Sequence, residues 1–217
     1  MSTWKHLIRF EATDSQVYTS SLPVVKEESE LVESTVRGFA SFADLLNGSS
    51  GKSVFGELTI ATSKDARDVS VEEASNYILG YTVGTDLTAR SYQDPKRGGG
   101  QFTRCKAFDG FAPLGPVLTT AEAFGDLEGH RIITKVNGKV FQDSACLRPD
   151  PWISSFDELP LSGRTIGTTL PAGTVIMMGS PPGTGYFQNP KCKLKNGDVA
   201  KVGVSSIGTL RNTMVFE

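Results

Sequence analysis

Two acidic side chains lie in stretches that read as strands, and both have the chemistry of ligands for a hard cation. Glu57 is the single acid of VFGELTI (residues 54–60), and Asp86 ends an apolar run in YTVGTDLTARSYQ (residues 81–93). Mg²⁺ takes carboxylate and water oxygens and usually needs few protein carboxylates. Two carboxylates on neighbouring strands could therefore hold a divalent ion if a third ligand joined them. The alternative is that each acid is a solvated strand residue.

Cationic and amide side chains follow the second of these strands. Lys106 lies in RCKAFDG (residues 104–110), among apolar residues and glycine. A lysine near a metal could neutralise a substrate carboxylate or a developing enolate. Its alternative role is that of a surface lysine with a buried stem. Gln93, with Lys106, is a candidate catalytic residue and Arg90 is a candidate for substrate binding, although Arg90 and Gln93 also suit a structural role.

A glycine-rich segment, MGSPPGTGY (residues 178–186), follows a predicted strand. Glycines allow backbone N–H groups to approach an anion, which makes Gly179, Ser180 and Gly183 candidates for substrate binding. No Gly-Lys-Ser/Thr follows, so it is not a Walker loop, and no helix pattern follows, so it is not a dinucleotide-binding loop. A tight turn is the alternative.

The elements that position these residues are mostly short strands. YTVGTD (residues 81–86) places Thr82, Gly84 and Asp86 on one face. RIITKVNGKVF is a predicted hairpin whose Asn137-Gly138 pair suits a type I′ turn. Further extended segments are expected at residues 6–12, 57–63, 112–120, 170–178 and 198–217, the last as two strands around Gly208.

Helices are expected to be few. Ser70 and Glu73 form a capping-box pattern before a helix at residues 71–79 that Gly80 would stop. A solvated helix or loop is expected at residues 26–38, and short helices at residues 39–53 and 155–162. The fold class predicted is mainly β with helical additions (α+β). Residues 1–50 have too few apolar runs for a core of their own, so we expect an N-terminal annex at 1–50 and a main domain at 51–217.

Composition narrows the class of protein. The 217 residues are 38% hydrophobic and 21% charged, with a net charge of -2. The sequence has no basic stripe with interleaved aromatic residues, so nothing in it favours nucleic-acid binding. No apolar run approaches the roughly 20 residues of a membrane span. Polar residues break the apolar ones at the N-terminus, so no secretory signal is expected there. Three distant cysteines argue against a disulfide framework and favour a reducing, cytoplasmic location.

Four ordered blocks resemble the fumarylacetoacetate hydrolase (FAH) family: GELTIATSKDARDVSVEEASNYILGYTVGTDLTARSYQ, CKAFDGFAPLGPVL, VNGKVFQ and GSPPGTG. The resemblance covers about residues 54–217, and WKHLIRFEA is similar to the small N-terminal domain of longer members. It implies a mixed β-roll, a homodimer, and Mg²⁺ or Mn²⁺ held by three carboxylates. It also implies a substrate that is a β-dicarbonyl or 2-oxo acid, cleaved by C–C hydrolysis, decarboxylated or isomerised between keto and enol forms.

The family's functional positions carry over only in part. Glu57 and Asp86 match two of the three carboxylate ligands, whereas Phe55 occupies the place of the first. Gln93 and Lys106 match the substrate-side Gln and Lys, and Ser180 stands where the family usually has Thr. The upstream Asn-Tyr-x-x-His block, whose His–Glu pair activates water, has no counterpart in this sequence. Ion binding is therefore expected to be weak or lost.

Two functions remain open from the sequence. The first is an FAH-family-like enzyme, for which enolate stabilisation is easier to supply than C–C hydrolysis because no general base is evident. The second is a metal-poor, inactive family member that acts as a binding or scaffold partner, which Phe55 favours. In either case a small keto acid and a second copy of the chain are the expected partners. The resemblance thus implies a shortened, divergent member of the family.

Overall fold

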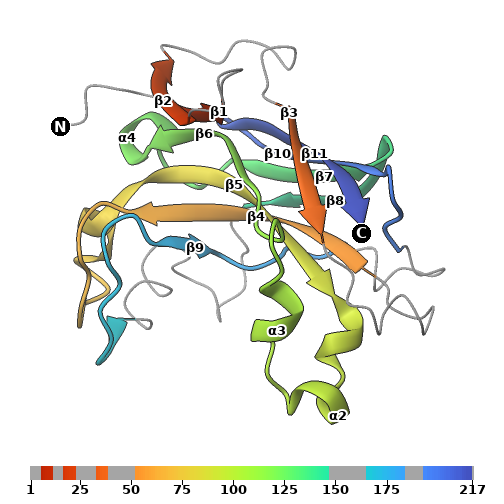
Figure 1. Cartoon of the computed structure of the whole chain (residues 1–217). Coiled ribbons are helices and arrows are strands. Elements are labelled where there is room, and N and C mark those ends of the chain that lie inside the picture. Colours follow the sequence, from red (N-terminus) through yellow and green to blue (C-terminus); the bar gives the residue numbers. More distant parts are fainter. Residues whose placement is uncertain are drawn as a thin grey trace.

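The computed structural model describes residues 6–11, 17–22, 33–38, 52–146, 165–183 and 193–216. Over these residues, two β-sheets stack face to face, and the helices are short (Figure 1). The mainly β fold with helical additions, predicted from the sequence, is confirmed. No helix among these residues is both long and apolar enough to pass through a membrane.

The first sheet has the strand order β2-β1-β6-β5-β4-β9, and all its pairs are antiparallel. Its strands are β1 (His6–Glu11), β2 (Val17–Leu22), β4 (Lys52–Thr62), β5 (Ile78–Ala89), β6 (Leu114–Thr120) and β9 (Val175–Met177). The second sheet has the order β3-β11-β10-β7-β8. Its strands are β3 (Glu33–Gly38), β7 (Arg131–Val136), β8 (Lys139–Ala145), β10 (Val199–Val204) and β11 (Gly208–Phe216), and only β3 and β11 pair in parallel.

The long β4–β5 pair separates two faces, because successive side chains of a strand point to opposite sides. The inner face points to the second sheet and comprises Val54, Gly56, Leu58 and Ile60 of β4 with Leu87, Thr85, Val83 and Tyr81 of β5. The outer face comprises Ser53, Phe55, Glu57 and Thr59 of β4 with Thr88, Asp86, Gly84 and Thr82 of β5. The predicted alignment of Thr82, Gly84 and Asp86 on one face is confirmed.

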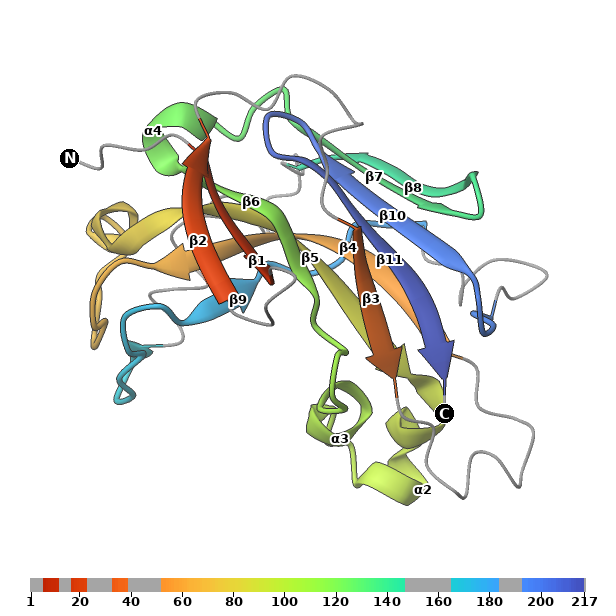
Figure 2. The same cartoon turned by 45° about the horizontal axis from the view of Figure 1, so that its top comes forward.

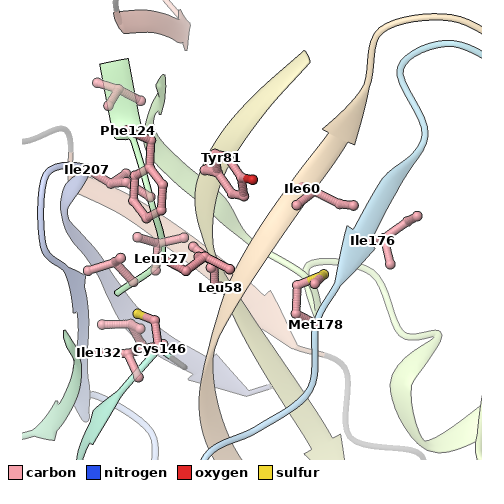
Figure 3. Packing of buried hydrophobic residues seen from close by; sticks show 14 of the residues in the cluster. Leu58, Ile60, Tyr81, Phe124, Leu127, Ile132, Cys146, Ile176, Met178 and Ile207 are labelled. Carbon is pink, nitrogen blue, oxygen red and sulfur yellow. The ribbon is translucent and has the colours of Figure 1, made fainter. Parts of the chain in front are cut away.

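The inner face supplies the apolar core. Leu58, Ile60 and Tyr81 pack with Phe124 and Ile207 in one buried cluster between the sheets (Figure 3). A second cluster lies nearer the start of β4 and includes Val54, Leu87, Phe111, Val136, Leu194, Ala200 and Met214. The two clusters fix the first sheet on the second and leave the outer face for other contacts.

The hairpin predicted at residues 131–141 is confirmed as β7 and β8. Asn137 and Gly138 connect the strands with φ values of 49° and 83°, as a type I′ turn requires. The strands expected near residues 6–12, 57–63, 112–120, 170–178 and 198–217 are confirmed as β1, β4, β6, β9 and the β10–β11 pair.

The helix predicted at residues 71–79 is wrong in length. Only a 3₁₀ helix, η2 (Ala74–Tyr77), forms, and β5 begins at Ile78. The Ser70 hydroxyl bonds the Glu73 carboxylate at 3.3 Å. Pairing of Ile78 with Thr62, together with packing of Tyr77 on the core, overrides the local helix signal.

The prediction of a solvated helix or loop at residues 26–38 is also wrong over residues 33–38. That segment is β3, which extends the second sheet along β11 (Figure 2). Its β-branched Thr35 and Val36 suit a strand, and the hydrogen-bonding edge of β11 gives it a partner. The helices predicted at 39–53 and 155–162 lie outside the described residues, apart from 52 and 53, which belong to β4.

Four short helical segments within the described residues were not predicted. They are η3 (Arg90–Gln93), α2 (Pro95–Gly98), α3 (Thr103–Lys106) and α4 (Ala121–Phe124). Asp94 caps α2 by accepting a hydrogen bond from the Lys96 N–H at 3.0 Å, and Thr120 caps α4 in the same way through Ala123 at 3.1 Å. Both views show α2 and α3 beyond the end of β5 (Figures 1 and 2).

Candidate active site

The two predicted carboxylates are neighbours on the outer face. Asp86 lies directly opposite Phe55, and Glu57 lies directly opposite Gly84, so the two acids are a diagonal pair across β4 and β5. Both residues are buried, with 5% of Glu57 and 7% of Asp86 exposed. The sequence pattern alone placed them on neighbouring strands, and the register brings them together.

Glu57 is held by the segment that follows β9. The Gly179 N–H donates to Glu57 Oε2 at 3.0 Å, and the Ser180 hydroxyl donates to Oε1 at 2.5 Å. Gly179 takes a φ of 99°, which a residue with a side chain rarely adopts. Two of the three residues predicted for substrate binding in this segment therefore contact an acidic side chain.

Burial raises the pKa of Glu57 above its ordinary value. The negative charge of Asp86 adds to this rise, whereas the hydrogen bonds from Ser180 and Gly179 and the charge of Lys106 oppose it. A carboxyl group with a raised pKa holds a proton closer to neutral pH and is a stronger base when ionised. Glu57 can therefore both accept and return a proton.

Asp86 forms a direct ion pair with Lys106. Lys106 ends α3, and Cys105 beside it is fully buried, which anchors the short helix against the body of the domain. The side chain of Lys106 remains 39% exposed, whereas that of Asp86 is only 11% exposed. The ammonium group thus bridges the buried acid and the solvent, where a bound molecule would arrive.

Phe55 is buried on the outer face, and a cation lies on its ring. The Arg90 guanidinium carbon is 4.4 Å from the ring centroid, a cation–π contact. The Arg90 Nε donates to the Ser53 hydroxyl at 2.8 Å, and its terminal nitrogen donates to Gln93 Oε1 at 2.5 Å. Gln93, predicted as catalytic, is thus placed as a partner of Arg90.

The segment after β9 is fastened to the second sheet by a residue that the sequence analysis did not single out. The buried Gln142 of β8 accepts a hydrogen bond from the Gly56 N–H at 2.8 Å and donates to the Pro181 carbonyl at 3.0 Å. Gly183 lies close to β8, since a Cβ there would be 2.3 Å from the Phe141 carbonyl oxygen. The only sequence signal for Gln142 was its place at the end of the block VNGKVFQ.

The donor set does not fit the three-carboxylate metal site that the resemblance implied. Phe55 has no lone pair to offer, and the two remaining acids already accept from Gly179, Ser180 and Lys106. Two cationic side chains, Arg90 and Lys106, lie on the same face. Within the described parts of the chain, no group of three or more His, Cys, Asp and Glu side chains could hold an ion.

In the described part of the chain, no histidine side chain lies beside Glu57, Asp86 and Lys106. His130 Nε2 lies 3.1 Å from the Phe124 carbonyl, and the ring stacks on Phe124, a member of the core cluster. Its contacts are structural, and they lie with α4 and the start of β7. Among the described residues, the candidates for proton transfer on the outer face are therefore the carboxyl groups and Lys106.

Known proteins are similar to this chain in both sequence and fold. A family model described as the C-terminal region of fumarylacetoacetate (FAA) hydrolase matches residues 47–215. The chain is 42% identical over 161 residues to an uncharacterized protein of Archaeoglobus fulgidus, which covers 74% of this chain and 57% of the other. It is 33% identical over 159 residues to a mitochondrial oxaloacetate tautomerase of Xenopus laevis, which covers 73% and 48%. The chain spans about half the length of these curated relatives.

Solved structures agree. A fumarylacetoacetate hydrolase from Exiguobacterium antarcticum matches with a TM-score of 0.70 at 31% identity, over 94% of this chain and 67% of that one. A 5-carboxymethyl-2-hydroxymuconate delta-isomerase from Mycobacterium smegmatis matches with a TM-score of 0.67 at 29% identity, over 96% and 72%. The resemblance of the four sequence blocks is thereby confirmed, and the chain belongs to the fumarylacetoacetate hydrolase family.

Proposed function

We propose that the chain is an enzyme that interconverts the keto and enol forms of a small 2-oxo dicarboxylic acid of the oxaloacetate class. The relatives support the general kind of reaction, since they include an oxaloacetate tautomerase and an isomerase. The observation that carries the proposal is the buried Glu57 carboxyl beside the Lys106–Asp86 ion pair. It combines a group that can hold a proton with a cation that can stabilise an enolate.

The reaction requires one proton transfer away from carbon and one toward oxygen. The Glu57 carboxylate takes a proton from C3, and the electron pair of that C–H bond forms the C2–C3 double bond. The C2 oxygen gains negative charge, which the Lys106 ammonium stabilises, and it then accepts a proton from the Glu57 acid. The raised pKa of Glu57 suits both halves of this exchange.

The remaining residues have supporting roles in this proposal. Arg90 and Lys106 bind the carboxylates of the substrate, and Gln93 positions Arg90. Gly179 and Ser180 orient Glu57 through their hydrogen bonds, while Gly183 lets the segment lie against β8. C–C hydrolysis is a weaker candidate because the only histidine side chain described stacks on Phe124.

The test follows the loss of the enol form of oxaloacetate by ultraviolet absorbance. We expect the parent to accelerate ketonisation over buffer, and Glu57→Gln to lower kcat by about a hundredfold or more, as loss of a positioned acid–base typically does. The exposed Lys193 provides a matched control, and Lys193→Ala should behave as the parent. A parent that does not accelerate ketonisation of oxaloacetate over buffer would refute the proposal.

The second candidate is a binding protein without turnover. The specific observation in its favour is Phe55, which stands in place of an acidic ligand. The same assay separates the two functions, provided that binding of malonate, an unreactive dicarboxylate, is measured beside it. Binding without turnover would establish the second candidate.

A further inference from the structure

The position expected for a third acidic ligand holds positive charge instead. Phe55 is 5% exposed, and the Arg90 guanidinium lies over its ring at 4.4 Å. An aromatic face attracts a cation because its quadrupole is negative there. The substitution of an acid by Phe55 therefore removes one negative charge and gives a cation a surface on which to rest.

A second cation lies across the strand pair. Phe55 and Asp86 are directly opposite each other in the β4–β5 register, and Asp86 is ion-paired with Lys106. Each member of this cross-strand pair thus carries a cationic partner, Arg90 on one side and Lys106 on the other. The two cations offset the negative charges of Asp86 and Glu57 on this face, so a divalent ion would be attracted far less than at a site of three unpaired carboxylates.

We propose that Arg90 and Lys106 take the place of the divalent ion, so that the outer face binds a small dicarboxylate directly and without metal. The substrate class in this inference rests on the proposed function. The planar guanidinium suits a bidentate contact with one carboxylate, and the ammonium suits a point contact with the second carboxylate or the enolate oxygen.

The guanidinium is held in place before any ligand arrives. Ser53, which is 3% exposed, accepts from Arg90 Nε at 2.8 Å, and Gln93 accepts from a terminal nitrogen. The ring of Phe55 supports the guanidinium through the cation–π contact. Less side-chain freedom is then lost on binding, which favours affinity.

The experiment measures binding of malonate to the purified full chain by calorimetry, once in EDTA and once in excess Mg²⁺. We expect the parent to bind malonate with the same dissociation constant, within about twofold, in both conditions. Titration of Mg²⁺ alone should give no saturable binding at micromolar concentration. Binding of malonate only when Mg²⁺ is present, or no binding in either condition, would overturn the inference.

Three variants separate the cation pair from simple packing. Arg90→Ala should weaken malonate binding in EDTA by about tenfold or more, because a charge-assisted contact is lost. Phe55→Leu keeps an apolar side chain but removes the ring face, and it should weaken binding by about two- to fivefold. Phe55→Glu restores a third carboxylate, so binding should fall in EDTA and recover in Mg²⁺.

Controls keep these outcomes interpretable. Lys193→Ala removes an exposed cation elsewhere and should leave the dissociation constant unchanged. Melting temperatures report whether each variant is folded, and Arg90→Gln replaces Arg90→Ala if the latter does not fold. Unchanged malonate binding in a folded Arg90 variant would overturn the inference.

Failure of the inference and failure of the proposed function give different results. A chain that binds malonate in EDTA but does not tautomerise oxaloacetate supports the inference and refutes the function. A chain that tautomerises oxaloacetate only with Mg²⁺ supports the function and overturns the inference.

Discussion

On β4, the side chains of Leu58 and Ile60 point to the second sheet. The side chains of Phe55 and Glu57 alternate with them along the strand and point to the candidate active site. The inner face joins an apolar cluster that spans both sheets (Figure 3). The outer face is equally buried at Ser53, Thr59 and Asp86, yet its described contacts are hydrogen bonds, one ion pair and one cation–π contact. One pair of strands therefore serves stability on one side and chemistry on the other.

This comparison shows why the two faces should respond differently to substitution. Loss of apolar volume on the inner face lowers the free energy of unfolding, because the site cannot fully collapse. Under the proposed function, loss of a charged group on the outer face removes an interaction with substrate, and that interaction does not contribute to the unfolding of the free protein. The predictions below test this separation, from the largest expected effect to the smallest.

Ile60→Ala should have the largest effect, and it should act on stability alone. Ile60 is fully buried in the core cluster, so we expect a loss of about 2–5 kcal/mol in the free energy of unfolding. Turnover per folded molecule should not change. Urea unfolding and activity are measured together, with Ile166→Ala as the control because Ile166 is 75% exposed. A reduced turnover in folded Ile60→Ala would break the comparison.

Lys106→Ala should have the converse effect. Removing a cation that stabilises a developing charge commonly raises the activation free energy by about 2.7–4 kcal/mol, a loss of about a hundredfold or more in turnover. Lys106→Arg should restore activity only in part, since the guanidinium is larger and flat. Turnover and melting temperature of both variants are compared with the parent. A full rate in Lys106→Ala would remove this residue from the mechanism.

Gln142 joins Gly56 of the inner face to the segment beside Glu57. Gln142→Leu would leave the Gly56 N–H and the Pro181 carbonyl without this partner, so we expect a loss of about 1–3 kcal/mol in stability. Because the Pro181 anchor also holds Ser180, kcat should fall as well, with little change in KM. Gln142→Glu keeps the acceptor for Gly56 and removes the donor to Pro181. If kcat falls in Gln142→Glu as it does in Gln142→Leu, the anchor at Pro181 is responsible.

The smallest effect should be on stability, as a pH dependence that comes from Glu57. Burial raises its pKa in the folded state, so the folded protein binds this proton more tightly than the unfolded chain does. Its contribution is fully present below the ordinary pKa of glutamate and is lost as the pH rises through the raised value. Glu57→Gln should lack this loss. Melting temperatures across that range, for parent and variant, measure the difference, and parallel curves would contradict the assignment.

Alternation and local turn signals predicted much of this architecture. The period of two placed Asp86 with Gly84 and Thr82, and Asn137-Gly138 located the β7–β8 hairpin, because both signals act over a few residues. The resemblance identified Phe55 as the residue in a ligand's place. The assignments of Lys106, Arg90, Gly179, Ser180 and Gly183 to the substrate, the homodimer and the domain boundary at residues 50/51 stay predictions.

Other features depend on contacts far apart in the sequence. The bond from Ser180 to Glu57 joins residues 123 positions apart in the sequence, and the bond from Gly56 to Gln142 joins residues 86 positions apart. No local sequence pattern could predict either bond. The strand β3 forms because β11 offers an edge, which the charged segment around it did not indicate. Asp94-Pro95 and Thr120 are local signals for the starts of α2 and α4. These helices were not predicted because such short segments have no helical spacing of apolar residues.

Gly56 lies between Phe55 and Glu57, and a side chain there would collide with Thr134 and Val202, whose nearest atoms lie 2.3 and 2.5 Å from a Cβ. Phe55 lies on the other face, away from those inner-face neighbours. Packing therefore restricts substitution at residue 56 more strongly than at residue 55. A change at residue 55 can exchange an acid for an aromatic ring and alter the charge of the site while the sandwich stays intact. A change at residue 56 would have to be matched in two strands of the opposite sheet. In such a protein, substitutions that change the charge of the site are tolerated more readily than substitutions that change the packing of the two sheets.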